Sequence, residues 1–203
     1  MIGWIFRKIF TRPGGLIAGY RLQTLWMETL TAADRKAVRK CVNQPMGAFQ
    51  QIDDGPPRTL SRMTQFEFLC KLTAWFIGPA SRPIGTKFAL AAETVPAKAS
   101  SVLDLHCSYT DLVNFWMRSR KENPEAELRA LHIAEAMVAI EQKAAIAWKK
   151  DDHKFGGAGE LPGHAGFDAL CRIYSKRGDS ESSATFAMQA KKRQWAGNWE
   201  KFL

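Results

Sequence analysis

The segment 170–190 limits most strongly what this chain can fold into, because its pattern predicts two amphipathic helices joined by a tight turn. Leu170, Ile173 and Tyr174 stand three and four residues apart, so they share one face of a helix. The Gly-Asp pair at 178–179 interrupts the pattern, as expected of a turn between two helices. This arrangement predicts a helical hairpin rather than a reaction centre.

The second helix of this hairpin repeats the spacing with mostly small side chains. Its packing face consists of Ser183, Phe186, Ala187 and Ala190. Small residues let two helix backbones approach closely, which a packed hairpin requires. The segment therefore predicts two helices in direct contact.

A looser copy of the hairpin precedes it in the chain. Leu112, Phe115 and Trp116 match the first triplet, with a bulky ring at the end of each. Two helices are expected here, at 109–120 and at 124–150. The matching positions of the second helix are Ala130, Ile133, Ala134 and Met137. We therefore expect the hairpin unit to occur twice in the second half of the chain.

Six positions of the clearer hairpin have the spacing of a known helical repeat. They are Leu170, Tyr174, Gly178, Asp179, Ser183 and Ala190. On these positions, residues 167–195 resemble a tetratricopeptide repeat (TPR), and 106–150 resemble it only loosely. Cys171, Ala187 and Trp195 depart from the motif, which usually has Gly or Ala, an aromatic ring and Pro at these places. The resemblance implies stacked hairpins with a concave, peptide-binding face and no chemistry of their own.

These patterns predict an all-α fold in which antiparallel helical hairpins stack as a short TPR-like array. Fewer than three repeats rarely stand alone, so an N-terminal helical region is expected to cap the stack. We expect Phe66, Leu69 and Phe76 to pack against the first helix of the array. The domain boundary is placed in a proline-rich connector, between a basic helical region at 1–100 and a TPR-like domain at 101–203.

The net charge of +9 is concentrated in the first half of the chain. Residues 1–100 carry 14 Lys and Arg against 6 Asp and Glu, whereas 101–203 carry 15 against 14. Any affinity for nucleic acid or for an anionic membrane surface is therefore expected in the first half. The residues expected to bind such a surface are Arg7, Lys8, Arg12, Arg35, Lys36, Arg39 and Lys40. A solvated basic face without a ligand is the simpler interpretation of the cluster at 35–40.

The first twelve residues form an amphipathic segment. Ile5, Phe6 and Ile9 share one stripe at helical spacing, and Arg7 and Lys8 lie beside it. Such a segment packs on the protein's own core, docks into a groove of a partner or lies on an anionic membrane surface, and all three alternatives stay open. No run approaches the ~18 apolar residues that a membrane-spanning helix needs, so no transmembrane segment is expected.

The four cysteines predict neither a disulfide framework nor a zinc motif. Cys41, Cys70, Cys107 and Cys171 lie far apart, and no two of them form a C-x-x-C pair. No secretory signal is recognised, so we expect four reduced thiols in a cytoplasmic protein. No cofactor is expected.

Neither the histidines nor the glycine-rich loop indicates catalysis. The four histidines (106, 132, 153 and 164) have no zinc-binding spacing, and His132 is expected to be a partly buried packing residue. The loop 156–163 is rich in glycine but lacks the Lys-Ser/Thr pair of a phosphate-binding loop, so it is interpreted as a connector. We therefore expect no enzymatic activity.

The leading hypothesis is a non-enzymatic adaptor, regulatory or immunity-type protein that binds another protein through its helical layer. The expected contact residues are Asn114, Arg118, Arg172 and Lys176, which form two pairs, each spaced one helical turn. Together they would form a basic strip, which favours an acidic peptide or segment. The alternative is binding of nucleic acid or an anionic membrane surface by the basic first half. Nucleic acid is not favoured, because no recognition-helix pattern is present.

Overall fold

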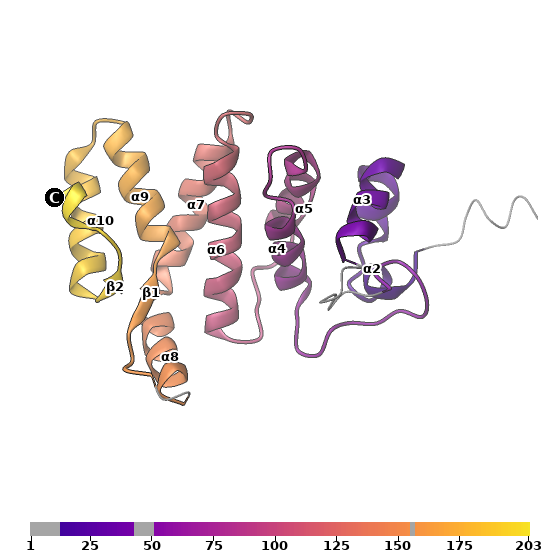
Figure 1. The fold of residues 1–203 in the computed structure, drawn as a ribbon, viewed down its shortest axis with the longest axis horizontal. Coiled ribbons are helices and arrows are strands. Elements are labelled where there is room, and N and C mark those ends of the chain that lie inside the picture. Colours follow the sequence, from indigo (N-terminus) through magenta and orange to yellow (C-terminus); the bar gives the residue numbers. More distant parts are fainter. Residues whose placement is uncertain (1–12, 43–50, 155–156) are drawn as a thin grey trace, which may run out of the picture. The chain divides into compact units, whose positions relative to one another are not determined.

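The computed structural model describes residues 13–42, 51–154 and 157–203, and it confirms the all-α fold class (Figure 1). The described chain is built of helices and two short strands. It divides into two compact units, Met1–Gln65 and Phe66–Leu203. The sequence placed the boundary near residue 100, whereas the structure groups the two helices before that residue with the second unit.

A close backbone contact between α2 (Gly15–Gly19) and the segment 51–58 organises the first unit. The amide N–H of Ile17 donates to the carbonyl oxygen of Ile52 at 2.8 Å. A Cβ atom at Gly19 would lie 1.7 Å from a carbonyl oxygen of that segment. Only glycine permits so close an approach. The π-helix η1 (Leu25–Thr29) and the helix α3 (Ala32–Val42) complete the helices of this unit.

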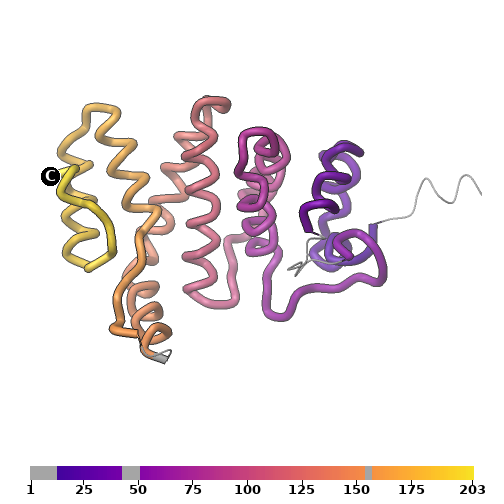
Figure 2. The backbone as a smooth tube through the Cα atoms, in the orientation of Figure 1, coloured from indigo at the N-terminus to yellow at the C-terminus, as the bar shows by residue number. Residues whose placement is uncertain are grey.

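The second unit consists of packed helices and a small pair of strands. Its α-helices are α4 (Gln65–Trp75), α5 (Arg82–Thr94), α6 (Val102–Ser119), α7 (Ala126–Ala139), α8 (Glu141–Lys154), α9 (Ala165–Lys176) and α10 (Ser180–Lys192). Helix α6 pairs with α7, α7 packs against α9, and α9 pairs with α10. Figure 2 traces this order along the backbone. Two helical hairpins, α6–α7 and α9–α10, are thus in contact through α7 and α9.

Small side chains bring α9 and α10 together, as the sequence predicts. Ser183 is buried, and its hydroxyl donates to the carbonyl oxygen of Cys171 across the hairpin at 3.1 Å. The rings of Tyr174 and Phe186 stack with their centroids 5.7 Å apart. A larger residue in place of the serine would separate the two backbones, so this position fixes the hairpin spacing.

The turn of the hairpin uses the residues that the sequence indicates. Gly178 has a φ of +78°, a left-handed conformation that glycine adopts without strain. Asp179 caps α10, because its carboxylate accepts the amide N–H of Ser182 at 3.0 Å. Each residue of the Gly-Asp pair therefore has a separate structural role.

Helices α4 and α5 pack on the outer side of the α6–α7 hairpin. Phe66, at the start of α4, contacts the ring of Tyr109 edge to face, with centroids 5.9 Å apart. Lys71 forms an ion pair with Asp111 of α6 at 3.0 Å. Gly85 of α5 lies against the ring of Phe115. The expected contact of Phe66 with the first helix of the array is present.

The prediction of one helix at 124–150 is wrong. The chain leaves the helix at Ile140, and α7 and α8 are separate elements. Glu141, the first residue of α8, is 4% exposed, and its carboxylate accepts the indole N–H of Trp195 at 3.3 Å. The first turn of α8 is thus in contact with a distant part of the chain, directly after the break between the two helices.

Two short strands in the second unit were not expected. Strand β1 (Leu161–Gly163) precedes α9, and strand β2 (Trp195–Ala196) follows α10. They pair in parallel, with Leu161 opposite Trp195. We call this strand pair the C-terminal clip. A short 3₁₀-helix, η2 (Glu200–Phe202), then contacts α10.

Gly85→Ala is expected to destabilise the second unit. The added Cβ would lie 2.5 Å from Cε2 of Phe115 and 2.7 Å from the carbonyl oxygen of Phe76. Overpacking of this kind costs about 1–3 kcal/mol, and the better helix propensity of alanine offsets up to ~1 kcal/mol of it. Urea unfolding followed by circular dichroism measures the change. Gly78→Ala is the matched control and should change stability by less than ~0.5 kcal/mol, because its new Cβ meets only Ser81 Oγ at 3.5 Å.

Candidate functional site

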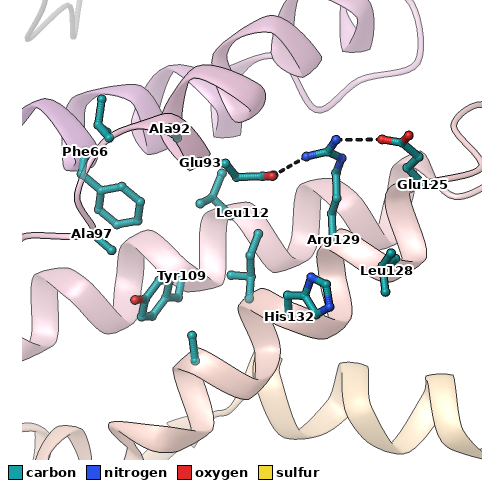
Figure 3. A pocket seen from close by; sticks show the side chains of 13 residues that line it. Phe66, Ala92, Glu93, Ala97, Tyr109, Leu112, Glu125, Leu128, Arg129 and His132 are labelled. Carbon is teal, nitrogen blue, oxygen red and sulfur yellow. Dashed lines mark hydrogen bonds and ion pairs between the residues drawn. The ribbon is translucent and has the colours of Figure 1, made fainter.

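A groove lies between α5 and α7 in the second unit, with α6 beneath it (Figure 3). We call it the α5–α7 groove, and its volume is about 500 Å³. It is lined by Phe66, Ala92, Glu93, Val95, Ala97, Tyr109, Leu112, Glu125, Leu128, Arg129, His132, Ile133 and Ala136. The lining is mainly apolar and has a few polar groups at one end, which is the usual composition of a binding site.

Helix α7 supplies most of one wall because its groove residues recur at helical spacing. Leu128, His132 and Ala136 lie four residues apart, and Arg129 and Ile133 each follow by one position. All five therefore face the same side of the helix. The alanine leaves space that a larger side chain would fill.

An ordered network of charged groups closes one end of the groove. Arg129 lies between two carboxylates and donates to Glu93 and to Glu125, the latter at 2.7 Å (Figure 3). The buried indole of Trp116 donates to the other oxygen of Glu93 at 2.7 Å. The guanidinium also lies over the Trp116 ring, 5.5 Å from its centroid. The hydrogen bond to Glu125 raises the pKa of Arg129 further above its already high value.

This end of the groove carries excess negative charge. Two carboxylates face one guanidinium, and the side chain of Glu125 is 67% exposed whereas that of Glu93 is 24% exposed. Glu93 is held by Trp116 and Arg129, so Glu125 is the carboxylate that a ligand reaches most easily. Leu128, which is 51% exposed, adds an apolar surface at the edge. The groove thus offers an apolar cavity beside an accessible carboxylate.

The residues that the structure describes include no cluster of three His, Cys, Asp or Glu side chains able to hold a metal ion. The groove has hydrogen-bonding and apolar groups but no nucleophile paired with a base among its lining residues. Among the helices of the described ranges, none is long and apolar enough to cross a membrane.

The four residues expected to contact a partner are exposed but lie outside the groove. Asn114 and Arg118 are on α6, and Arg172 and Lys176 are on α9. Arg172 forms an ion pair with Asp168 at 2.6 Å, and Lys176 is paired with Glu127 at 3.4 Å. The basic strip stays a prediction, and its two α9 cations already have carboxylate partners within the chain.

The expected anion-binding residues of the first half divide into three sets. Arg7, Lys8 and Arg12 lie outside the described residues. Lys36 and Lys40 are exposed on α3. The remaining two, Arg35 and Arg39, have structural partners: Arg35 donates to the carbonyl oxygens of Trp26 and Leu30, and Arg39 pairs with Asp53.

The central residues of the groove were not expected from the sequence. Arg129 follows Glu125 by four residues, and this spacing alone suggests an ion pair. No local signal brings Glu93 to the same place, because it comes from another helix. His132 was expected to be partly buried, and this prediction is wrong: its side chain is exposed and lines the groove.

The chain was compared with protein families, curated proteins and solved structures. No family model, no curated protein and no solved structure matches the chain. The TPR resemblance therefore rests on the sequence pattern of 167–195, and the groove is interpreted from its own geometry.

Glu93→Ala is expected to cost more stability than Glu125→Ala. Removing Glu93 leaves the buried indole N–H of Trp116 without its acceptor and removes one partner of Arg129, which should cost about 1–3 kcal/mol. Glu125 is mostly exposed, so its loss should cost less than ~0.5 kcal/mol. Urea unfolding of both variants measures the difference. Equal losses would show that the Glu93 network is not a structural anchor.

Proposed function

We propose that this protein is a non-enzymatic, cytoplasmic interaction module that binds a segment of another protein in the α5–α7 groove. The observation that carries the proposal is an apolar cavity of about 500 Å³ whose charged end is held in place by Glu93, Trp116 and Arg129. A site of this kind orders its polar groups before the ligand arrives, which lowers the entropic cost of binding.

The helical architecture supports the same proposal. Hairpins α6–α7 and α9–α10 pack in series, and the TPR resemblance implies a protein that presents a peptide-binding surface. Residues of α5, α6 and α7 line the groove. Helices placed beside one another in this way give a rigid wall, which suits recognition of an extended or helical peptide.

The chemistry of the groove selects the partner segment. Its apolar lining favours a large apolar side chain, and the accessible carboxylate of Glu125 favours a Lys or Arg next to that side chain. The basic strip of α9 would instead favour an acidic segment. We favour the groove, because it combines an apolar lining with an exposed carboxylate, and we therefore expect a segment that is apolar and basic.

Selection from a random peptide library on the full-length protein tests this function. Enriched peptides are expected to carry a large apolar residue next to Lys or Arg. Ala136→Trp fills the groove and should weaken their binding at least tenfold, measured by fluorescence polarisation. Ala139→Trp is the matched control, because Ala139 is exposed on the same helix but does not line the groove. It should bind like the wild type.

Two outcomes contradict the proposal. One is that no peptide is enriched. The other is that Ala136→Trp, folded by circular dichroism, binds enriched peptides like the wild type. If acidic peptides are enriched instead and Arg172→Glu with Lys176→Glu abolishes their binding, the interaction surface is the basic strip.

A further inference from the structure

Two histidines that the proposed function does not use are buried together where α6, α8, β2 and the start of α9 meet. His106 is 2% exposed and His164 is 1% exposed. Their ring centroids lie 4.9 Å apart. His106 stacks on Trp195 at 5.2 Å with the ring planes 7° apart, and Trp148 of α8 contacts it edge to face at 6.4 Å. The two imidazoles share one aromatic enclosure.

The hydrogen bond made by His164 determines its protonation state. Its Nδ1 atom accepts the amide N–H of Phe167 at 3.2 Å, so the side chain caps the N-terminus of α9. A ring nitrogen that accepts a hydrogen bond carries no proton, so the neutral ring holds its proton on Nε2. This cap exists only while the Nδ1 atom is unprotonated.

Several polar atoms of the cluster are buried without a hydrogen-bond partner among the described residues. They are both ring nitrogens of His106, the Nε2 atom of His164 and the indole nitrogen of Trp148. A buried polar group in this state is costly, and a buried charge costs much more. The cluster therefore accommodates neutral rings far better than charged ones.

Burial keeps both rings neutral. It lowers the pKa of His106 to about 4 and, together with the neighbouring His106, the pKa of His164 to about 3. Charged groups on the surrounding elements form hydrogen bonds or ion pairs with residues other than the two histidines. They are Asp104 of α6 with Ser101, Glu141 of α8 with Arg193, Lys149 of α8 with Gln194, and Asp168 of α9 with Arg172. None of these pairs includes either histidine.

We propose that the His106–His164 pair is an acid-sensitive latch that keeps the C-terminal clip and the N-terminus of α9 closed while both rings are neutral. Protonation of His164 converts Nδ1 from an acceptor into a donor, so the cap is lost and a cation is placed at the positive end of the helix dipole. A proton on His106 adds a like charge 4.9 Å away. Acid therefore opens the clip and exposes Trp195.

The direction of the pKa shifts sets the pH range of the latch. Both folded-state values lie below the ordinary histidine pKa of about 6.5, so the open form binds more protons as the pH falls. The closed form has its full advantage above about pH 6.5 and loses it progressively toward pH 4 for His106 and toward pH 3 for His164. The ratio of closed to open molecules falls by up to about tenfold per pH unit for each ring.

Amide hydrogen exchange measured by NMR on the full-length chain tests the latch. Between pH 6.5 and 4.5, the opening constants of Phe167 and Ala196 should rise at least tenfold more than those of the α4 amides. His106→Phe combined with His164→Asn keeps an aromatic ring beside Trp195 and a residue suited to an N-cap, but this variant cannot titrate. It should lose the extra pH dependence. His132→Asn alters an exposed histidine outside the cluster and should keep the pH dependence of the wild-type amide exchange.

The latch is overturned if the double variant keeps the pH dependence of the wild type. If the double variant does not fold, titration of the histidine ring signals in the wild-type protein decides. Apparent pKa values below 5 for both buried rings support the latch. Values near 6.5 in the folded protein overturn it, because neutral rings would then have no preference for the closed form.

Discussion

Burial of one face of α6 is the constraint on which the second unit depends. Leu112, Phe115 and Trp116 are 1%, 0% and 0% exposed, and each such side chain contributes about 1.5–3 kcal/mol when it leaves water. To cover this face, α5 approaches at Gly85 and α7 lies alongside. The same helix supplies part of the groove and one half of the histidine pair. The binding site and the proposed latch are therefore attached to one rigid element.

The local features of the fold are predictable from the sequence because neighbouring residues determine them. The turn at Gly178 and the cap at Asp179 depend on the conformational freedom of glycine and on the short carboxylate of aspartate. The close contact of α9 with α10 depends on small residues such as Ser183, whose spacing is visible in the sequence. The all-α class follows from the same kind of information.

The groove and the histidine pair depend on contacts between residues that are distant in the sequence. No local sequence pattern therefore indicates them. Glu93 joins Arg129 only after α5 and α7 have packed on α6, and His106 meets His164 only after α9 has docked. The first residue of α8, Glu141, likewise contacts Trp195, which lies 54 residues further along the chain. The sequence shows that Lys176 is an exposed charge on its helix, but its partner Glu127 comes from another helix, so no local spacing indicates the ion pair.

The parallel pairing of β1 with β2 has a topological consequence for the last hairpin. The first strand enters α9 and the second leaves α10, so their pairing joins the two ends of the hairpin into a closed ring. The hairpin already brings these ends together, which keeps the entropic cost of closing the ring small. Peptide-bond cleavage at the exposed turn near Gly178 would therefore leave two pieces that contact each other through the packed helices as well as through the strand pair. The C-terminal hairpin is held at its open end as well as at its turn.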